Sequence, residues 1–476
     1  MSQAAGRSGD PFAGRALPAW FAGAKLGIFI HWGVYSVPGW APMRKNLGDF
    51  VAARVAEGRV VNDVNDMLEL FLEDARLREA RNMGTSPYAE WYWNSLMNEG
   101  SPTAEHHKAH WGARSYESFA EDFREATRDW DPSSWADLFA RAGARYVVVT
   151  TKHHDGFCLW PTRTPHPRLS GWSTKRDLVG DLGAALKAAD IRLATYYSEG
   201  LDWSLKGLPM RRFTDMVDAI VQAPEEVAYM RAHLDEIVER FAPSLIWGDI
   251  AAPRDMDVHG FLKSYYERVP DGVVNDRFQT MAPGDRSRHA DYATTEYFAP
   301  SEPFARKWEV CRGLARSFGY NRADDDRETI SREALVALLA DTAAHNGNLL
   351  LGVGPMADGT IPDLQRARLE ELGAWLAVNG EAIFDTAPAA PHAARTAEGH
   401  EVRFTRRDGV LYAIVLGRTS GTVSLPRLDA LAGPIRVSAL GLGEVGHRAG
   451  ASGLAVDLSR ADDSTGTVIR IAPAGS

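Results

Sequence analysis

Short apolar runs with strand character alternate with helical runs over most of the chain, and this alternation limits the possible folds more than any other feature. The helix at 224–241 is the clearest, because apolar residues from Val227 to Phe241 recur at steps of three and four. Asp131 and Pro132 form a typical helix start. The strand-like runs lie at 26–30, 146–150, 191–197, 245–247, 273–275 and 348–353, and further helical runs lie at 177–190, 256–269, 331–345 and 364–384.

Strands that alternate with helices of these lengths predict βα units and a parallel sheet. The number of units approaches eight, which favours a closed (β/α)8 barrel, the TIM-like architecture, over an open doubly wound sheet. No G-x-G-x-x-G motif follows the first strand-like run, so a dinucleotide-binding fold is disfavoured. We therefore expect an α/β protein in which residues 1–384 form a catalytic (β/α)8-like barrel.

The pattern changes after residue 384. The Pro/Ala-rich stretch at 386–391 predicts a linker, and apolar residues beyond it alternate with polar ones at period two. Asp408 and Gly409 have the composition of a hairpin turn. We expect residues 385–476 to form a C-terminal antiparallel β-sandwich. A charged, helix-prone stretch at about 43–87 interrupts the barrel pattern, and we expect it to be an insertion over the barrel mouth.

Composition narrows the classes of partner. The chain has 53 Lys and Arg against 63 Asp and Glu, a net charge of −10, which argues against nucleic acid. There is no polybasic patch and no apolar run of about 18 residues, so we expect no membrane contact. The N-terminus has no apolar signal-peptide core, and Cys158 and Cys311 are expected to be free thiols. These features predict a cytoplasmic protein.

Polar and aromatic residues cluster directly after the strand-like runs. The clusters are His31 with Trp32, residues 152–157, Tyr197, residues 247–249 and residues 275–277. In a (β/α)8 barrel the carboxyl ends of the strands meet at one face, where active sites lie. Imidazoles, carboxylates and tryptophans around one pocket indicate a sugar site, because rings stack on sugar C–H faces and polar groups hold hydroxyls. All 14 tryptophans lie at or before Trp375, which places this chemistry in the first part of the chain.

Hydrolysis of a glycoside needs two carboxyl groups. Asp249 fits best, since the apolar run at 245–247 leads directly to it. Glu296, in the segment 291–297, is the second candidate. The competing carboxylates are Asp155, Glu199, Asp202 and Asp276.

Several motifs, in order from about residue 18 to 384, resemble the α-L-fucosidases of glycoside hydrolase family 29. Two of them are distinctive, KHHDGF at 152–157 and NGNLLL at 346–351. The others are WF at 20–21, GIFIHWG at 27–33, YSVP at 35–38, EWY at 90–92, WGD at 247–249, WE at 308–309, SFGYN at 317–321, GP at 354–355 and DGTI at 358–361. The C-terminal β-sandwich also belongs to the family pattern.

The resemblance implies a retaining mechanism, with Asp249 as nucleophile and Glu296 as acid/base. It also implies that a set of side chains holds the fucose hydroxyls, namely His31, Glu90, Trp91, His153, His154, Tyr197 and Arg277. Trp247 and Phe318 would line the pocket, with Phe318 near the methyl group of the sugar. Glu90 and Glu309 are alternatives for the acid/base, whose position varies between branches of the family. Gly248 is smaller than the residue that many members carry before the nucleophile.

The function predicted from these residues is a retaining exo-α-L-fucosidase that acts on fucosylated oligosaccharides or glycosides through a covalent fucosyl-enzyme. The alternatives are a barrel hydrolase for another α-linked sugar, such as α-galactose, and a non-catalytic sugar-binding homologue. No cofactor is expected. No metal is expected either, because no third ligand has helpful spacing from His153 and His154. The fucosyl linkage and the oligomeric state, including a homo-oligomer, stay open.

Overall fold

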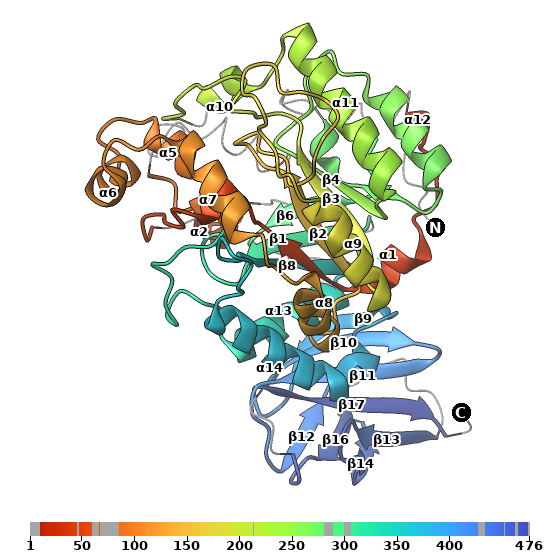
Figure 1. The fold of residues 1–476 in the computed structure, drawn as a ribbon. Helices are drawn as coiled ribbons and strands as arrows, with labels where there is room; N and C mark the ends of the chain where they lie inside the picture. Colours follow the sequence, from red (N-terminus) through yellow and green to blue (C-terminus); the bar gives the residue numbers. More distant parts are fainter. Residues whose placement is uncertain are drawn as a thin grey trace.

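Eight parallel strands in the described part of the chain form the central sheet, in the order β5-β4-β3-β2-β1-β8-β7-β6. Figure 1 shows this sheet with helices such as α8 (Pro132–Arg141), α9 (Leu178–Ala188) and α11 (Pro224–Phe241) around it. The computed structural model describes residues 10–44, 47–59, 66, 85–212, 214–279, 289–298, 306–426, 434–451, 453–461 and 465–474. The strands are β1 Leu26–Ile30, β2 Tyr146–Lys152, β3 Arg192–Ser198, β4 Leu245–Asp249, β5 Val273–Val274, β6 Ala293–Glu296, β7 Trp308–Gly313 and β8 Gly347–Val353. This is the sheet of a (β/α)8 barrel, as the alternation in the sequence predicted.

The two end strands of this order, β5 and β6, are joined by one residue. The main-chain N–H of Asp291 donates to the Val274 carbonyl (3.0 Å), and the Val274 N–H donates to Asp291 Oδ2 (2.8 Å). Arg15 forms an ion pair with the same carboxylate (2.7 Å), so the N-terminal segment helps to hold this seam. In a closed barrel, β5 and β6 would pair through main-chain hydrogen bonds. Here the hydrogen bonds between Asp291 and Val274 connect the two strands instead.

Helices surround the sheet, and side-chain caps fix where five of the described α-helices begin. Ser101, Asp131, Asp177, Asp257 and Ser331 each accept a hydrogen bond from a main-chain N–H in the first turn of the following helix. The α-helices are α1 Ala19–Ala24, α2 Leu47–Ala56, α5 Tyr92–Leu96, α6 Pro102–Trp111, α7 Phe119–Ala126, α8 Pro132–Arg141, α9 Leu178–Ala188, α10 Asp215–Ala219, α11 Pro224–Phe241, α12 Val258–Arg268, α13 Arg332–Ala344 and α14 Asp363–Asn379. The short 3-10 helices are η1 Val34–Ser36, η3 Ala89–Trp91, η4 Tyr116–Ser118, η5 Asp276–Phe278 and η6 Gly380–Ala382.

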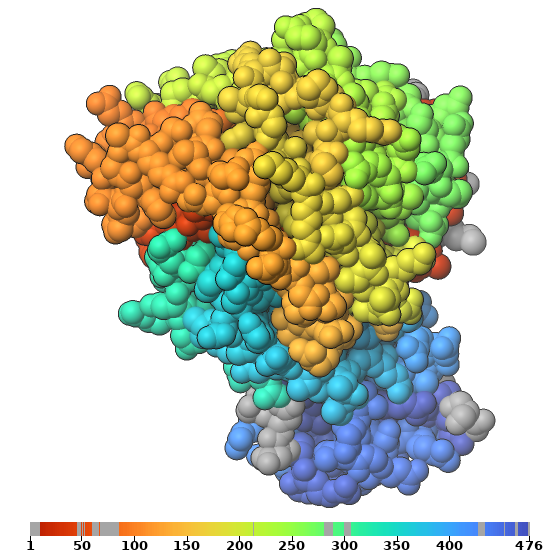
Figure 2. Space-filling model, in the orientation of Figure 1, coloured from red at the N-terminus to blue at the C-terminus, as the bar shows by residue number. Residues whose placement is uncertain are grey.

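The strands after the barrel form two antiparallel sheets, ordered β14-β13-β17-β11-β10-β9 and β12-β16-β15. Their bounds are β9 Ala387–Arg395, β10 Glu401–Arg407, β11 Val410–Leu416, β12 Thr422–Leu425, β13 Ile435–Ala439, β14 Gly443–Glu444, β15 His447–Gly450, β16 Gly453–Asp457 and β17 Gly466–Pro473. Figure 2 shows these strands (blue) as a lobe against the last barrel helices. The expected hairpin turn is confirmed, since Asp408 and Gly409 both have positive φ between β10 and β11.

Strand β11 is buried on both faces, and this explains its continuous apolar sequence. Leu411, Ala413 and Val415 pack in the core between the two antiparallel sheets. Tyr412 and Ile414 point the other way and join the barrel core, where α13 packs on β9, β10 and β11. A strand that serves two cores cannot show the simple apolar–polar alternation of a half-exposed strand.

Two sequence-based expectations are wrong in detail. Residues 387–391 of the predicted linker at 386–391 lie in strand β9. Among the described strands, β9 is an edge strand that pairs with β10, and an edge is where a sheet tolerates proline. The helix predicted at 364–384 ends at Asn379 and continues as η6. The expected insertion at about 43–87 falls largely outside the described residues, although α2 is part of it. Cys158 and Cys311 are buried free thiols, and no helix described is long and apolar enough to cross a bilayer.

Candidate active site

The carboxyl ends of β4 and β6 bring the two predicted catalytic carboxylates to the same end of the barrel. Asp249 is the last residue of β4, after the buried run Leu245–Trp247, and Glu296 is the last residue of β6. Both side chains are 13% exposed, so each has limited access to solvent. The other strand-end clusters predicted from the sequence surround these two residues.

Asp249 is held by donors from three neighbouring elements. Its Oδ2 accepts a hydrogen bond from the hydroxyl of Tyr196 on β3 (2.7 Å). Its Oδ1 accepts from the main-chain N–H of Ile250 (2.7 Å) and from Arg277 on η5 (3.2 Å). Charge-assisted hydrogen bonds of this kind are the stronger ones in proteins, and here they fix the orientation of the carboxylate. The arrangement suits a nucleophile, which must be held in one orientation toward the carbon that it attacks.

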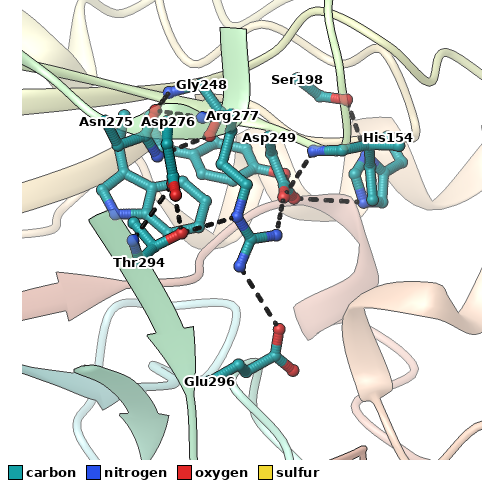
Figure 3. A network of polar contacts seen from close by, with 12 residues as sticks. His154, Ser198, Gly248, Asp249, Asn275, Asp276, Arg277, Thr294 and Glu296 are labelled. Atoms are coloured by element: carbon teal, nitrogen blue, oxygen red, sulfur yellow. Dashed lines mark hydrogen bonds and ion pairs between the residues drawn. The ribbon is translucent and has the colours of Figure 1, made fainter. Parts of the chain in front are cut away.

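Arg277 connects the two carboxylates, as Figure 3 shows. One terminal nitrogen of its guanidinium lies 3.2 Å from Asp249 Oδ1, and the other lies 3.8 Å from Glu296 Oε2. Its Nε donates to the hydroxyl of Thr294 on β6 (3.0 Å), which in turn donates to Asp276 (2.7 Å). This chain of bonds fixes the guanidinium plane, so that one cation serves both acids.

Glu296 also meets a tyrosine and a second buried acid. The hydroxyl of Tyr88 donates to Glu296 Oε1 (2.9 Å). Glu90 is buried on η3, and burial raises its pKa to about 7, an effect that the charge of Glu296 increases. Glu90 Oε2 accepts hydrogen bonds from the Gly319 N–H (2.8 Å) and from the Ser317 hydroxyl (3.0 Å). These bonds fix the Glu90 carboxyl group beside Glu296.

Three buried histidines form a neutral polar wall beside Asp249. Burial lowers the pKa of His31 to about 3 and of His154 to about 4, and it lowers that of His153 as well. The 3.5 Å approach of His154 Nε2 to Asp249 Oδ2 is therefore not an ion pair at neutral pH. The Ser198 hydroxyl donates to the Leu201 carbonyl, so His154 Nδ1 must carry the proton and donate to Ser198 (2.7 Å). This leaves the Nε2 lone pair free to accept a sugar hydroxyl.

The structure moves one predicted site residue to its neighbour. The Tyr197 hydroxyl lies 3.1 Å from Nδ1 of His233 on α11, on the helix side of β3. Tyr196 is the tyrosine that faces the site, where its ring stacks between His153 (5.4 Å between centroids) and Trp247 (5.7 Å). Successive side chains of a strand point to opposite faces, so one residue of offset exchanges the two positions completely. The prediction for Tyr197 is thus corrected to Tyr196.

Aromatic rings complete the walls of the site. Trp91 lies edge-on to His154, with 5.4 Å between the ring centroids. The ring centroid of Phe318 lies 4.9 Å from that of His31. Trp203, which the sequence did not single out, packs against both His154 (5.4 Å) and Trp91 (5.5 Å). Tyr88 and Trp203 were missed because neither comes directly after a strand-like run. The sequence signals near them were the EWY motif, two residues after Tyr88, and the end of β3, five residues before Trp203.

The competing carboxylates are engaged in structural bonds. Asp202 forms a fully buried ion pair with Lys152 (2.9 Å), and Asp155 accepts from the Tyr116 hydroxyl (2.7 Å). Asp276 supports Thr294, as described above. Glu309 accepts hydrogen bonds from Trp247 (3.0 Å), Tyr292 (3.3 Å) and Tyr146 inside the barrel. Glu199 contacts the main chain of Asp249.

Among the residues that the structure describes, one group of three has ligand atoms close enough for a metal ion. Those of His153, His154 and Asp249 lie within 4.8 Å of one another, so Asp249 could supply a third ligand that spacing in the sequence did not reveal. The same atoms face the position that a sugar would occupy beside the nucleophile. Hydrolysis by two carboxyl groups requires no metal at this place.

Two carboxylates lie at the strand ends of a (β/α)8 barrel, inside a wall of imidazole and aromatic rings. This arrangement is typical of the active site of a glycoside hydrolase. The family model described as Alpha-L-fucosidase matches residues 4–381. The tissue alpha-L-fucosidase of Bos taurus is 32% identical over 421 residues, which cover 84% of this chain and 75% of that protein. The chain belongs to the α-L-fucosidase family.

Solved structures agree with this assignment. The Thermotoga maritima alpha-fucosidase in complex with fucose is 37% identical, with a TM-score of 0.80 over 96% of this chain and 97% of that chain. The same enzyme in complex with a mechanism-based inhibitor has a TM-score of 0.81 at 36% identity, covering 97% of this chain and 98% of that one. The likeness therefore includes the C-terminal sheets as well as the barrel.

Proposed function

We propose that this protein is a retaining exo-α-L-fucosidase that removes terminal α-L-fucose from glycans or fucosides. Given the family of the chain, one observation supports the proposal most strongly: Arg277 contacts both Asp249 and Glu296 at the carboxyl ends of the barrel strands. The guanidinium of Arg277 thus contacts two carboxylates whose other partners differ: Tyr196 donates to Asp249, and Tyr88 donates to Glu296. This arrangement supports the roles of nucleophile and acid/base that the sequence predicted.

In the first step, a carboxylate oxygen of Asp249 attacks the anomeric carbon of fucose and forms a covalent ester. The bond from that carbon to the leaving oxygen breaks, and the leaving oxygen takes its electron pair together with a proton from Glu296. The hydrogen bonds from Tyr196 and Ile250 hold the Asp249 carboxylate in place for this attack. Glu296 is left ionised, 3.8 Å from the Arg277 cation.

In the second step, the ionised Glu296 takes a proton from water while the water oxygen attacks the anomeric carbon. The ester bond to Asp249 breaks, so the products are α-L-fucose, free Asp249 carboxylate and protonated Glu296. Two inversions restore the original anomeric configuration. The Tyr88 hydroxyl suits this cycle, because a hydroxyl can donate to the carboxylate and accept from the carboxylic acid.

The histidines and Glu90 are assigned to the sugar hydroxyls. His31, His153 and His154 are neutral at pH 7, so they can accept or donate hydrogen bonds without adding charge beside the nucleophile. Nδ1 of His31 and of His153 finds no hydrogen-bond partner among the described residues. Buried polar atoms of this kind are satisfied when a ligand binds. Phe318, packed on His31, supports an apolar contact for the methyl group of fucose.

Hydrolysis of 4-nitrophenyl α-L-fucoside, compared with the α-galactoside, tests the proposal. We expect release of nitrophenol from the fucoside only, and α-L-fucose as the first product seen by proton NMR. Release from the galactoside alone would identify a hydrolase for another sugar. No release from either glycoside, with fucose binding intact, would identify a sugar-binding homologue. A β-anomer as first product would contradict the retaining mechanism.

A further inference from the structure

Gly248, directly before Asp249 on β4, leaves a space that a second buried acid occupies. A Cβ atom at Gly248 would lie 2.4 Å from Oε1 of Glu199 and 3.0 Å from Cε2 of Phe278. The first distance is shorter than any Cβ contact normally seen, and Glu199 is completely buried. Glu199 can therefore occupy its position only because residue 248 has no side chain.

Glu199 also holds the main chain of the proposed nucleophile. Ser198 on β3 pairs with Asp249 on β4, so Glu199 follows at the point where β4 ends. Its Oε2 accepts a hydrogen bond from the main-chain N–H of Asp249 (2.9 Å). A displacement of Glu199 would consequently move the residue whose carboxylate attacks the sugar.

A second side chain holds the same stretch from the opposite side. Oδ1 of Asn275, at the end of β5, accepts from the Gly248 N–H (3.1 Å), and its Nδ2 donates to the Gly248 carbonyl (2.9 Å), as Figure 3 shows. Residues 248 and 249 thus lie between Asn275 and Glu199. Strand β5 has only two residues, so these side-chain bonds take the place of a longer ladder beside β4.

The environment of Glu199 favours its uncharged form. Burial raises the pKa of Glu199 well above its usual range, and the charge of Asp249 raises it further. A neutral carboxyl group can still accept the hydrogen bond from the Asp249 N–H. It does so without placing a second negative charge behind the nucleophile. This separates Glu199 from the catalytic carboxylates, among which the sequence had placed it as a competitor.

We propose that Glu199 is a positioning residue for the fucosidase reaction: it fixes the main chain of Asp249 and fills the space left open at Gly248. This inference rests on the proposed role of Asp249 as nucleophile. A positioning defect of this kind lowers kcat and changes KM little, because the sugar-binding side chains stay in place. It acts on the formation of the covalent fucosyl-enzyme.

The first experiment compares Glu199→Gln with Glu199→Ala, using kcat per active site titrated with 2-deoxy-2-fluoro-α-L-fucosyl fluoride. We expect Glu199→Ala to lower kcat by about tenfold or more, since the Asp249 N–H loses its acceptor. Glu199→Gln keeps a neutral acceptor of the same shape and should retain kcat within about threefold, with an unchanged pH profile. Equal damage in both variants, or full kcat in Glu199→Ala, would overturn the proposal.

The control is Glu236→Ala on α11. Glu236 is also buried and accepts a main-chain hydrogen bond, from Arg163 (3.1 Å), but its described contacts are with Thr162, Arg163 and Arg240, away from β4. Its loss should lower thermal stability and leave kcat per titrated site unchanged. If Glu236→Ala lowered kcat as much as Glu199→Ala, the effect at Glu199 would be general loss of packing, and the proposed role would be wrong.

The second experiment is a double-mutant cycle between Glu199 and Gly248. Gly248→Ala alone should lower kcat, because its Cβ pushes against Glu199. Glu199→Ala with Gly248→Ala removes the clash, so the double variant should be more active than the product of the two single effects predicts. Additive effects would contradict the proposed fit between the two residues.

Labelling of the wild-type protein separates this inference from the proposed mechanism. Mass spectrometry of the fluorofucosyl-enzyme should place the label on Asp249. A label on a different residue would overturn both the mechanism and the positioning role. A label on Asp249, together with an unaffected Glu199→Ala variant, would overturn the positioning role alone.

Discussion

The ends of β4 and β6 each present one of the two carboxylates to which we assign the catalytic roles, but they hold it differently. Both carboxylates are followed by a left-handed residue other than glycine, Ile250 (φ 65°) and Tyr297 (φ 64°). After Asp249, this turn directs the Ile250 N–H onto Oδ1 of the carboxylate itself (2.7 Å). After Glu296, the Tyr297 N–H donates instead to the Cys311 carbonyl (2.9 Å), and the contacts of the carboxylate include Tyr88 and Arg277.

This difference matches the proposed roles, a fixed nucleophile and a group that exchanges a proton. A left-handed β-branched residue costs about 1–3 kcal/mol, and at Ile250 that cost accompanies a hydrogen bond to Asp249. Asp249 receives donors from β3, from η5 and from its own turn, which together fix the orientation of its carboxylate. Glu296 meets a hydroxyl that can donate or accept and a longer ion pair. Such contacts suit an acid that becomes a base in the same cycle.

Of the substitutions considered, removal of the Glu296 carboxyl group should lower kcat/KM most, by an amount that depends on the leaving group of the substrate. Glu296→Ala is expected to lower kcat/KM by about 10³-fold for glycosides with poor leaving groups and far less for activated aryl fucosides. The reason is that only a poor leaving oxygen needs the proton in the transition state. Steady-state kinetics over a series of aryl fucosides measures this, and equal losses for all leaving groups would assign the acid to another residue.

Arg277 is the point where the two carboxylates depend on each other, so its substitution tests the comparison directly. Arg277→Lys keeps a positive charge but cannot reach both acids with one planar group. We expect kcat to fall about 100-fold, from a loss of about 3 kcal/mol in the transition state. A variant with wild-type kcat would show that the bridge has no role in catalysis.

Tyr196 and Tyr197 provide a matched pair of smaller effects. Tyr196→Phe removes the hydroxyl that donates to Asp249, and it should lower kcat about tenfold, as expected for one hydrogen bond to a charged group. Tyr197→Phe removes a hydroxyl that contacts His233 on α11, so kcat should stay near the wild-type value. A larger loss in Tyr197→Phe than in Tyr196→Phe would reverse the structural correction.

Glu90, beside Glu296, should appear in the pH dependence of stability. Burial raises the Glu90 pKa from 4.5 to about 7, so between these values the folded state keeps a proton that the unfolded state has released. The free energy of unfolding therefore falls as pH rises from about 4.5 to about 7, with a contribution of about 3 kcal/mol.

Glu90→Gln cannot ionise and should remove this part of the pH dependence. Urea unfolding at about pH 5 and about pH 8 measures the slope for both proteins. The wild-type protein should lose more stability than the variant between the two pH values. The same decrease in both would show that Glu90 does not hold the additional proton.

Metal removal should have the smallest effect. His153, His154 and Asp249 could together hold an ion, but an ion there would bind the Asp249 carboxylate. Asp249 could then not act as the proposed nucleophile, and its role would no longer differ from that of Glu296 as described above. Dialysis against EDTA is therefore expected to leave kcat/KM unchanged. A loss of activity that zinc restores would contradict a mechanism based on carboxylates alone.

The sequence predicted those parts of the fold that have a local signal. The buried strands and the helix at 224–241 follow from periodicity, and the Asp408–Gly409 turn follows from its composition. Strands β6 and β7 were not identified as strands, because neither ATTE at 293–296 nor WEVCRG at 308–313 shows a continuous aliphatic run. They form through pairing with each other and with β8, which is a tertiary effect.

The site shows the same limit. Strand-end position and family resemblance together identified Asp249 and Arg277, and the family resemblance pointed to Glu296; the structure brings the three residues into contact. Which of two adjacent tyrosines faces the pocket depends on the register of β3, and this is a property of the whole sheet. The contact of Glu199 with the main chain of Asp249 depends on the pairing of β3 with β4. Neither relation leaves a pattern in the sequence.

The anomer of fucosyl azide formed by two variants tests the central claim, the different roles of the two carboxylates, most directly. With an activated fucoside and added azide, Asp249→Gly should yield β-L-fucosyl azide, because azide replaces the lost nucleophile in a single inversion. Glu296→Ala should yield α-L-fucosyl azide, because azide replaces water in the second step. Proton NMR distinguishes the two products. The opposite pair of anomers, or no rescue of Asp249→Gly by azide, would contradict the account.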